Sequence, residues 1–164
     1  MTTLGATSMD AKTPKAAPSN TPVSGDGYKF SASYAEDAKW DPGLRDFFEY
    51  RDLGVKAATG GEFKAHILRV KDGGDPGDLH TTGLHTHGLG FQMIYILKGW
   101  IKFVYHIEDA DADGGTREEA HTFGPGDCCL QPPSILHNEL ECSDDLELIE
   151  ITSPANYPTE AVGE

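Results

Sequence analysis

The hydrophobic residues of this chain lie in short segments separated by turns, and the pattern within these segments is that of β-strands. Residues 63–68 alternate between two sets of side chains with a period of two, which is the periodicity of a strand. Clusters of Gly, Pro and Asp at 71–78, 113–115 and 124–127 predict turns. Further segments of strand length lie at 84–87, 91–97, 100–107, 120–123, 128–131, 135–140 and 146–151. Because the sequence contains no long amphipathic helical pattern, it predicts an all-β sandwich or barrel.

The segment 91–97 is apolar on both faces of the predicted strand. Alternate residues would share a face, which gives the two sets Gln92, Ile94, Ile96 and Met93, Tyr95, Leu97. A half-exposed antiparallel strand normally has one polar face. We therefore expect the outer face, where Tyr95 serves in packing, to be covered by the aromatic-rich segment 28–50, by a second subunit, or by both. A homodimer is the prediction that follows.

The composition changes along the chain and divides it into four parts. Residues 1–27 are rich in Ala, Thr, Ser and Pro and contain almost no bulky apolar groups, which predicts a disordered tail. Residues 28–61 contain many aromatic side chains and are expected to form an arm that packs on the barrel or on a dimer partner. We place the barrel at residues 62–154 and a C-terminal tail at residues 155–164.

The length and charge limit the classes of function. A chain of 164 residues is expected to form one domain. Its formal net charge of −14 disfavours binding to nucleic acid or to anionic membranes. We find no apolar segment long enough for a membrane span and no secretory signal, so we expect a cytoplasmic protein. The three cysteines (Cys128, Cys129 and Cys142) form no disulfide framework, and we interpret the adjacent pair as small, partly buried residues.

Three histidines and one glutamine are the candidate ligands of a metal ion. His85 and His87 lie two residues apart on a predicted strand and therefore project from the same face. Gln92 follows a glycine-bounded bend, and His137 follows a turn at two prolines. Neutral imidazole is a common ligand of Zn, Fe, Ni and Cu. Three imidazoles and one amide oxygen would leave coordination positions open for water or substrate, as in catalytic sites.

The remaining histidines have no partners at similar spacing. We interpret them as surface or ordinary polar residues: His66, His80, His106 and His121. A His-x-His pair by itself is a weak signal, because strands at the surface often carry polar pairs on one face.

Taken together, the candidate ligands resemble the two signature motifs of the cupin superfamily. The matching residues are His85-x-His87-x4-Gln92-x6-Gly99 in the first motif and Gly126-x5-Pro132, followed by His137, in the second. The resemblance covers residues 63–154 and is closest to small single-domain cupins that bind metal. It implies an antiparallel jelly-roll barrel with the metal inside, near one open end.

Two departures from the usual cupin motifs deserve a physical interpretation. Ser134 replaces a usual glycine, which affects a turn and leaves the ligands intact. Gln92 stands where the family usually has glutamate. An amide ligand leaves a divalent site with a charge of about +2 instead of +1, which favours anionic ligands and weakens metal retention. Changing Gln92 to glutamate is therefore expected to tighten the binding of a divalent metal. A similar set of three His and one Gln occurs in cupins that process unsaturated sugar acids.

The resemblance implies a metal-dependent enzyme with a small-molecule substrate. We expect one divalent transition metal (Fe, Zn, Mn or Ni) and a small oxygen-rich metabolite that chelates it through two adjacent oxygens. The reaction would be that of a dioxygenase or of a non-redox isomerase or lyase. Glu150 is the candidate general acid or base, because it shares a strand face with Leu146 and Leu148, and burial there would raise its pKa. A position at the surface end of the strand is the other interpretation of Glu150.

Two alternatives to an enzyme remain at the level of sequence. The first is a non-catalytic cupin that senses or stores a small ligand. The second is a barrel that has lost its metal and holds water among the four polar residues.

Overall fold

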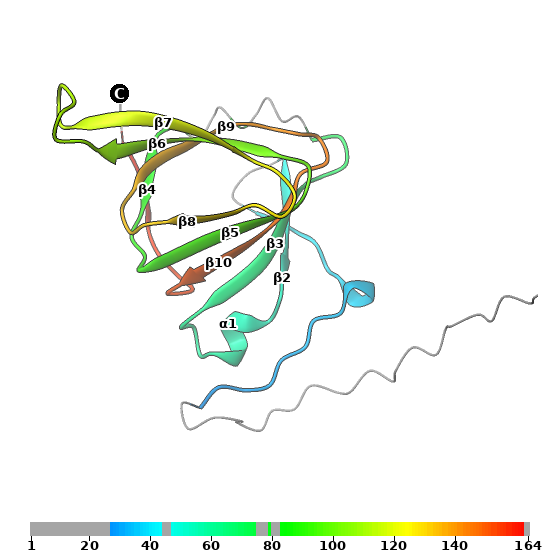
Figure 1. Ribbon diagram of the computed structural model, residues 1–164. Coiled ribbons are helices and arrows are strands. Elements are labelled where there is room, and N and C mark those ends of the chain that lie inside the picture. Colours follow the sequence, from blue (N-terminus) through cyan, green and yellow to red (C-terminus); the bar gives the residue numbers. More distant parts are fainter. Residues whose placement is uncertain (1–26, 44–46, 75–78, 80–82, 163–164) are drawn as a thin grey trace, which may run out of the picture.

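The chain folds into two antiparallel sheets that face each other (Figure 1). The computed structural model describes residues 27–43, 47–74, 79 and 83–162. The first sheet has the strand order β1-β2-β3-β10-β5-β8 and the second β11-β4-β9-β6-β7. In the first sheet the strands are β1 (Asp41–Pro42), β2 (Phe48–Asp52), β3 (Lys64–Val70), β5 (Phe91–Lys98), β8 (Cys128–Gln131) and β10 (Glu147–Ser153). In the second they are β4 (His85–His87), β6 (Ile101–Glu108), β7 (Thr116–Phe123), β9 (Leu136–Cys142) and β11 (Thr159–Ala161).

The described residues include little helix. A 3-10 helix spans Ala35–Asp37 and a single α-helical turn, α1, spans Val55–Ala58. The prediction of an all-β protein is therefore confirmed. The strand pairings of the described residues lie within each sheet and none joins the two sheets, so they define two facing layers and no closed barrel. Within this part of the chain, no helix is long and apolar enough to cross a membrane.

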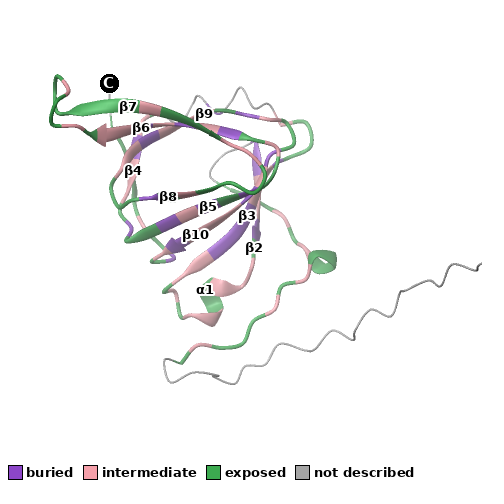
Figure 2. Ribbon diagram, in the orientation of Figure 1, coloured by how far each residue is buried: buried purple, intermediate pink, exposed green. Residues whose placement is uncertain are grey.

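The core lies between the sheets and is formed by the inward faces of their strands. On β5, Ile94 and Ile96 point inward and are buried, as Figure 2 shows for the purple segments of this strand. They belong to one apolar cluster with residues of both sheets, which includes Phe48, Ile101, Phe103, Tyr105, Leu146 and Leu148. Gln92 shares the inward face with Ile94, so β5 carries a polar side chain into one end of this core.

The segment before β2 covers the outer face of β2 and β3. Arg51 of β2 donates a hydrogen bond to Ser33 at 3.0 Å, and the guanidinium of Arg69 on β3 lies 3.7 Å from the ring centre of Trp40. This cover explains why Ile67 is buried although it points away from the core. The outer face of β5 differs, because Tyr95 and Leu97 each remain 39% exposed. The described residues of the expected arm therefore do not cover it.

Three strands, β1, β2 and β11, lie outside residues 62–154 and extend the two sheets. β2 pairs with β3, and β11 pairs with β4 through Thr159 opposite His87. The predicted N-terminal tail, apart from residue 27, and His80 lie outside the described residues. Of the two adjacent cysteines, Cys128 is exposed, whereas Cys129 is partly buried and lies 3.4 Å from the hydroxyl of Tyr105.

Candidate metal centre

The three predicted histidine ligands come together between β4 and β9. His85 and His87 project from β4, and His137 lies directly opposite His85 in the pairing of the two strands. The ring centres are 4.4 Å apart for His85 and His137, 4.9 Å for His85 and His87, and 5.1 Å for His87 and His137. One nitrogen of each ring lies within 4.8 Å of the others, an arrangement that could hold a metal ion.

Hydrogen bonds at the back of the rings determine which nitrogen is available to a metal. Nδ1 of His85 lies 3.0 Å from the carbonyl oxygen of Gly83, and Nδ1 of His137 lies 2.9 Å from that of Ile135. A carbonyl oxygen can only accept a hydrogen bond, so Nδ1 must carry the proton in both rings. The lone pair of the neutral ring is then on Nε2. Such a fixed tautomer is the usual condition of histidines that bind metals.

His87 is held in the neutral form that a metal requires. Its Nδ1 lies 3.0 Å from the hydroxyl oxygen of Thr159 on β11. Burial, followed by the nearby charges of His137 and His85 when they are protonated, lowers the pKa of His87 from 6.5 to about 4. Near pH 7 this ring is therefore uncharged and can act as a ligand without first losing a proton.

Gln92 is oriented by a carboxylate. Its Nε2 donates a hydrogen bond to Oε1 of Glu150 at 2.8 Å, and the side chain is 4% exposed. Because a carboxylate can only accept, the amide nitrogen must face Glu150 and the amide oxygen must lie on the other branch. The hydrogen bond therefore leaves the amide oxygen, the atom that could bind a metal, directed away from Glu150.

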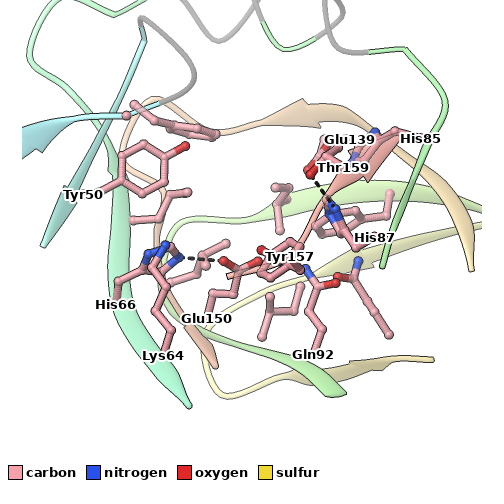
Figure 3. A pocket seen from close by; sticks show the side chains of 18 of the residues that line it. Tyr50, Lys64, His66, His85, His87, Gln92, Glu139, Glu150, Tyr157 and Thr159 are labelled. Carbon is pink, nitrogen blue, oxygen red and sulfur yellow. Dashed lines mark hydrogen bonds and ion pairs between the residues drawn. The ribbon is translucent and has the colours of Figure 1, made fainter. Parts of the chain in front are cut away.

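Glu150 points inward, as the strand pattern predicted, but its pKa is shifted in the direction opposite to the one we expected. Its other oxygen lies 2.6 Å from Nε2 of His66, and the carboxylate side chain is 17% exposed (Figure 3). Burial alone would raise the pKa, but the hydrogen bond and charge of His66, the hydrogen bond from Gln92 and the charge of Lys64 lower it to about 2. The predicted increase was wrong, because the pattern along one strand gave no information about His66.

The interpretation of His66 as a surface or ordinary polar residue was wrong. It is 4% exposed and pairs with Glu150 across β3 and β10, so it is a buried part of the site. His121, in contrast, is exposed as expected and lies beside Glu119. His106 is partly buried beside Glu118, as an ordinary polar residue would be.

A cavity of about 650 Å³ opens in front of these residues. Its inner wall consists of core side chains, including Ile94, Phe103 and Leu148, and its polar wall carries the residues labelled in Figure 3. Sequence analysis missed several of the polar lining residues: Tyr50, Lys64, His66, Glu139, Tyr157 and Thr159. Tyr157 and Thr159 follow the last strand that the hydrophobic pattern revealed, and no feature of the sequence assigned them to the site.

Comparisons with known proteins identify the fold. No family model matches the chain, and no curated protein matches it. Solved structures do: the oxalate decarboxylase of Lactobacillus farciminis in a formate complex has 17% identity and a TM-score of 0.52, over 77% of this chain and 34% of that one. The polyketide cyclase RemF from Streptomyces resistomycificus has 18% identity and a TM-score of 0.56, over 82% of this chain and 87% of that one. The Fe(II) protein HppE has 14% identity and a TM-score of 0.50, over 74% and 59%.

The chain has the cupin fold. The resemblance of its motifs to those of cupins is thereby confirmed by a second, independent kind of comparison. The chain spans about a third of the length of the oxalate decarboxylase chain that it matches, and its length is closer to that of the cyclase. At these levels of identity the likeness concerns the fold alone.

The residues of this site fit a divalent transition metal. The convergent nitrogens belong to three imidazoles, two of which carry a proton on Nδ1 and, in the neutral ring, have their lone pair on Nε2. Nitrogen donors of this kind suit Fe, Zn, Mn or Ni, and do not suit the hard ions Ca and Mg.

Proposed function

We propose that this cupin is a metal-dependent enzyme that acts on a small oxygen-rich metabolite. One divalent transition metal (Fe, Zn, Mn or Ni) would be held by Nε2 of His85, His87 and His137 and by the amide oxygen of Gln92. The observation that carries the proposal is the convergence of three imidazoles, each with Nδ1 in a hydrogen bond. Two of them, His85 and His87, line a cavity of about 650 Å³.

The chemistry follows from the charge of the donor set. When bound, a divalent metal would supply Lewis acidity, or a site for dioxygen in the case of Fe(II). Because all four donors are neutral, they would leave the site with a charge of about +2 and favour substrates that bind through an enolate, hydroxy-acid or dicarbonyl group. The reaction is that of a dioxygenase or of a non-redox isomerase or lyase.

We infer that Glu150 contributes to this site as a positioning residue. One of its oxygens accepts a hydrogen bond from Gln92 and the other lies against Nε2 of His66. A carboxylate engaged at both oxygens holds its neighbours in place and is less suited to take a proton from a substrate. The role as general acid or base that its strand position suggested is therefore the less favoured one.

Metal analysis of the purified protein tests the proposal. We expect close to one equivalent of a transition metal in the wild type and a large loss in His137→Ala. The matched control is His121→Ala, since His121 is exposed and does not line the cavity. Only trace metal in the wild type, or equal metal in His137→Ala, would refute the metal site.

A second measurement separates the reaction types. Oxygen uptake by the metal-loaded protein with catechols, dicarbonyls and sugar acids identifies a dioxygenase, whereas product formation without oxygen uptake identifies an isomerase or lyase. Tight binding of such compounds without any turnover would support the alternative of a non-catalytic binding or sensing cupin.

We also propose that a second copy of the chain covers the outer face of β5 and β8. Tyr95 and Leu97 are each 39% exposed and Leu130 is 59% exposed, and β8 is the edge of its sheet. In a chain with a net charge of −14, an uncharged apolar face is where two copies can approach with least repulsion. Sedimentation at micromolar concentration should give a dimer for the wild type and for the control Thr116→Lys, and a monomer for Leu130→Lys. A wild-type monomer would contradict this proposal.

A further inference from the structure

We propose that Tyr157 donates a hydrogen bond to an oxygen of a metal-bound substrate, and that the substrate is a cyclic compound with two adjacent oxygens and an apolar body. The inference rests on the proposed function, because it requires a metal at the three histidines. It adds a substrate-binding residue and a substrate class that the ligand set alone does not specify.

The segment that carries Tyr157 is fixed on both sides. Before it, the backbone of Ala155 donates to Gly61 at 3.0 Å. After it, the carbonyl of Pro158 accepts a hydrogen bond from Gly88 at 2.9 Å, and β11 pairs with β4. The tyrosine is therefore held beside the strand that supplies two of the candidate ligands, and its position does not depend on a loose chain end.

The ring of Tyr157 lies against a candidate ligand and lines the cavity. Its centre is 5.2 Å from that of His87, with the two planes at 70°. The phenol also lies close enough to Glu150, Tyr50 and Glu139 for their charges to affect it, which places it among the polar residues of the cavity wall. Figure 3 shows Tyr157 between Glu150 and His87.

The hydroxyl of Tyr157 has no hydrogen bond to another of the described residues. This distinguishes it from Tyr105, whose hydroxyl accepts a hydrogen bond from Gln131 at 3.0 Å and contacts Cys129. Glu150 is the charged neighbour with the largest effect on Tyr157, and both of its oxygens already have partners in His66 and Gln92. A phenol that lines a cavity and whose hydroxyl makes no hydrogen bond to the described residues is suited to bind an oxygen atom of a ligand.

The shape and lining of the cavity indicate the rest of the substrate. A volume of about 650 Å³ falls in the range of cavities that hold ligands larger than a two- or three-carbon acid. The inner wall is formed by Ile94, Ile101, Phe103 and Leu148, which favour a ring or another apolar body. One oxygen of the ligand would bind the metal, and the adjacent oxygen would accept the hydrogen bond from Tyr157.

A titration with 4-nitrocatechol tests this inference. The compound has two adjacent oxygens on a ring, and its absorbance changes when it binds a metal. Zn(II)-loaded protein is used because zinc is inert to redox chemistry. We expect Tyr157→Phe to retain its zinc and to bind 4-nitrocatechol about 3- to 10-fold more weakly than the wild type, the usual effect of losing one hydrogen bond. The matched control is Tyr95→Phe, on the outer face of β5, which should bind like the wild type.

Each outcome bears on a separate part of the account. Equal affinity in Tyr157→Phe and the wild type would overturn the inference and leave the metal site intact. Loss of zinc in Tyr157→Phe would also overturn it, because the hydroxyl would then support the metal centre and not the ligand. A wild-type protein that does not hold zinc or any other transition metal would overturn the proposed function together with this inference.

Discussion

Replacing Gln92 with glutamate would turn a hydrogen bond into a contact between two carboxylates. In the wild type, Nε2 of Gln92 lies 2.8 Å from Oε1 of Glu150, and His66 occupies the other oxygen of Glu150 at 2.6 Å. A glutamate at position 92 would place an acceptor against an acceptor, with no proton between them. Charge alone led us to expect that this change tightens metal binding. The structure adds a second consequence: Glu150 opposes a second negative charge, so the metal-free single variant should be less stable than the wild type.

The distance between the side chains at positions 92 and 150 sets the size of the repulsion. Two unit charges 2.8 Å apart repel each other with about 6 kcal/mol at an effective dielectric constant of about 20. The pair would avoid this energy by binding one proton. Keeping a carboxyl group with an ordinary pKa of about 4.3 protonated costs about 3.7 kcal/mol at pH 7 and about 1 kcal/mol at pH 5. We therefore expect Gln92→Glu to lower the free energy of unfolding by about 2–4 kcal/mol at pH 7 and by less at pH 5.

Urea denaturation of the metal-free proteins at the two pH values measures this difference. The matched control is the exchange Gln92→Glu/Glu150→Gln. In it, the new amide at position 150 donates to the new carboxylate at position 92, while its oxygen can still face His66. The double variant should recover most of the lost stability at pH 7 and should retain a divalent metal at least as well as the wild type in a chelator challenge. A single variant as stable as the wild type at pH 7, or a double variant as unstable as the single one, would refute the reasoning.

Three further predictions concern residues around the site and on the surface. Thr159→Val should weaken metal affinity about tenfold, because it removes the partner of His87 at Nδ1, whereas Thr159→Ser should not; a competition titration with a chelator compares them, and equal affinity in all three proteins would contradict the role of the hydroxyl. Ser134→Gly should raise the melting temperature in calorimetry, because Ser134 has a φ of 61°, which costs a residue other than glycine about 1 kcal/mol; an unchanged or lower value would count against this. A thiol reagent should modify the exposed Cys128 first, because burial raises the pKa of Cys129 above its ordinary 9.0; mass spectrometry that finds both thiols labelled at one rate near pH 8 would disprove the difference.

The sequence was informative where a feature repeats over short distances. The period of two identified β3, and the spacing of His85 and His87 placed both rings on one face of β4. The turn at two prolines and the match to the second cupin motif both indicated His137, which the structure places opposite His85. In each case the relevant geometry is set by the backbone of a single strand or by a motif that defines a fold.

The sequence was uninformative where the partner of a residue comes from a distant strand. His66 and Glu150 are 84 residues apart and meet because β3 and β10 are neighbours in the sheet. The interpretation of His66 as an ordinary polar residue and the predicted increase in the pKa of Glu150 failed for this one reason. The short strand β11 contains no hydrophobic alternation, so the position of Thr159 beside His87 could not be predicted either.

X-ray absorption spectroscopy of the metal-loaded protein tests the central claim most directly, because it counts the ligands around the metal. We predict three imidazoles and one or more oxygen donors around the metal in the wild type. Fewer than three imidazoles in the wild type, or a sulfur ligand at about 2.3 Å from the metal, would contradict the account.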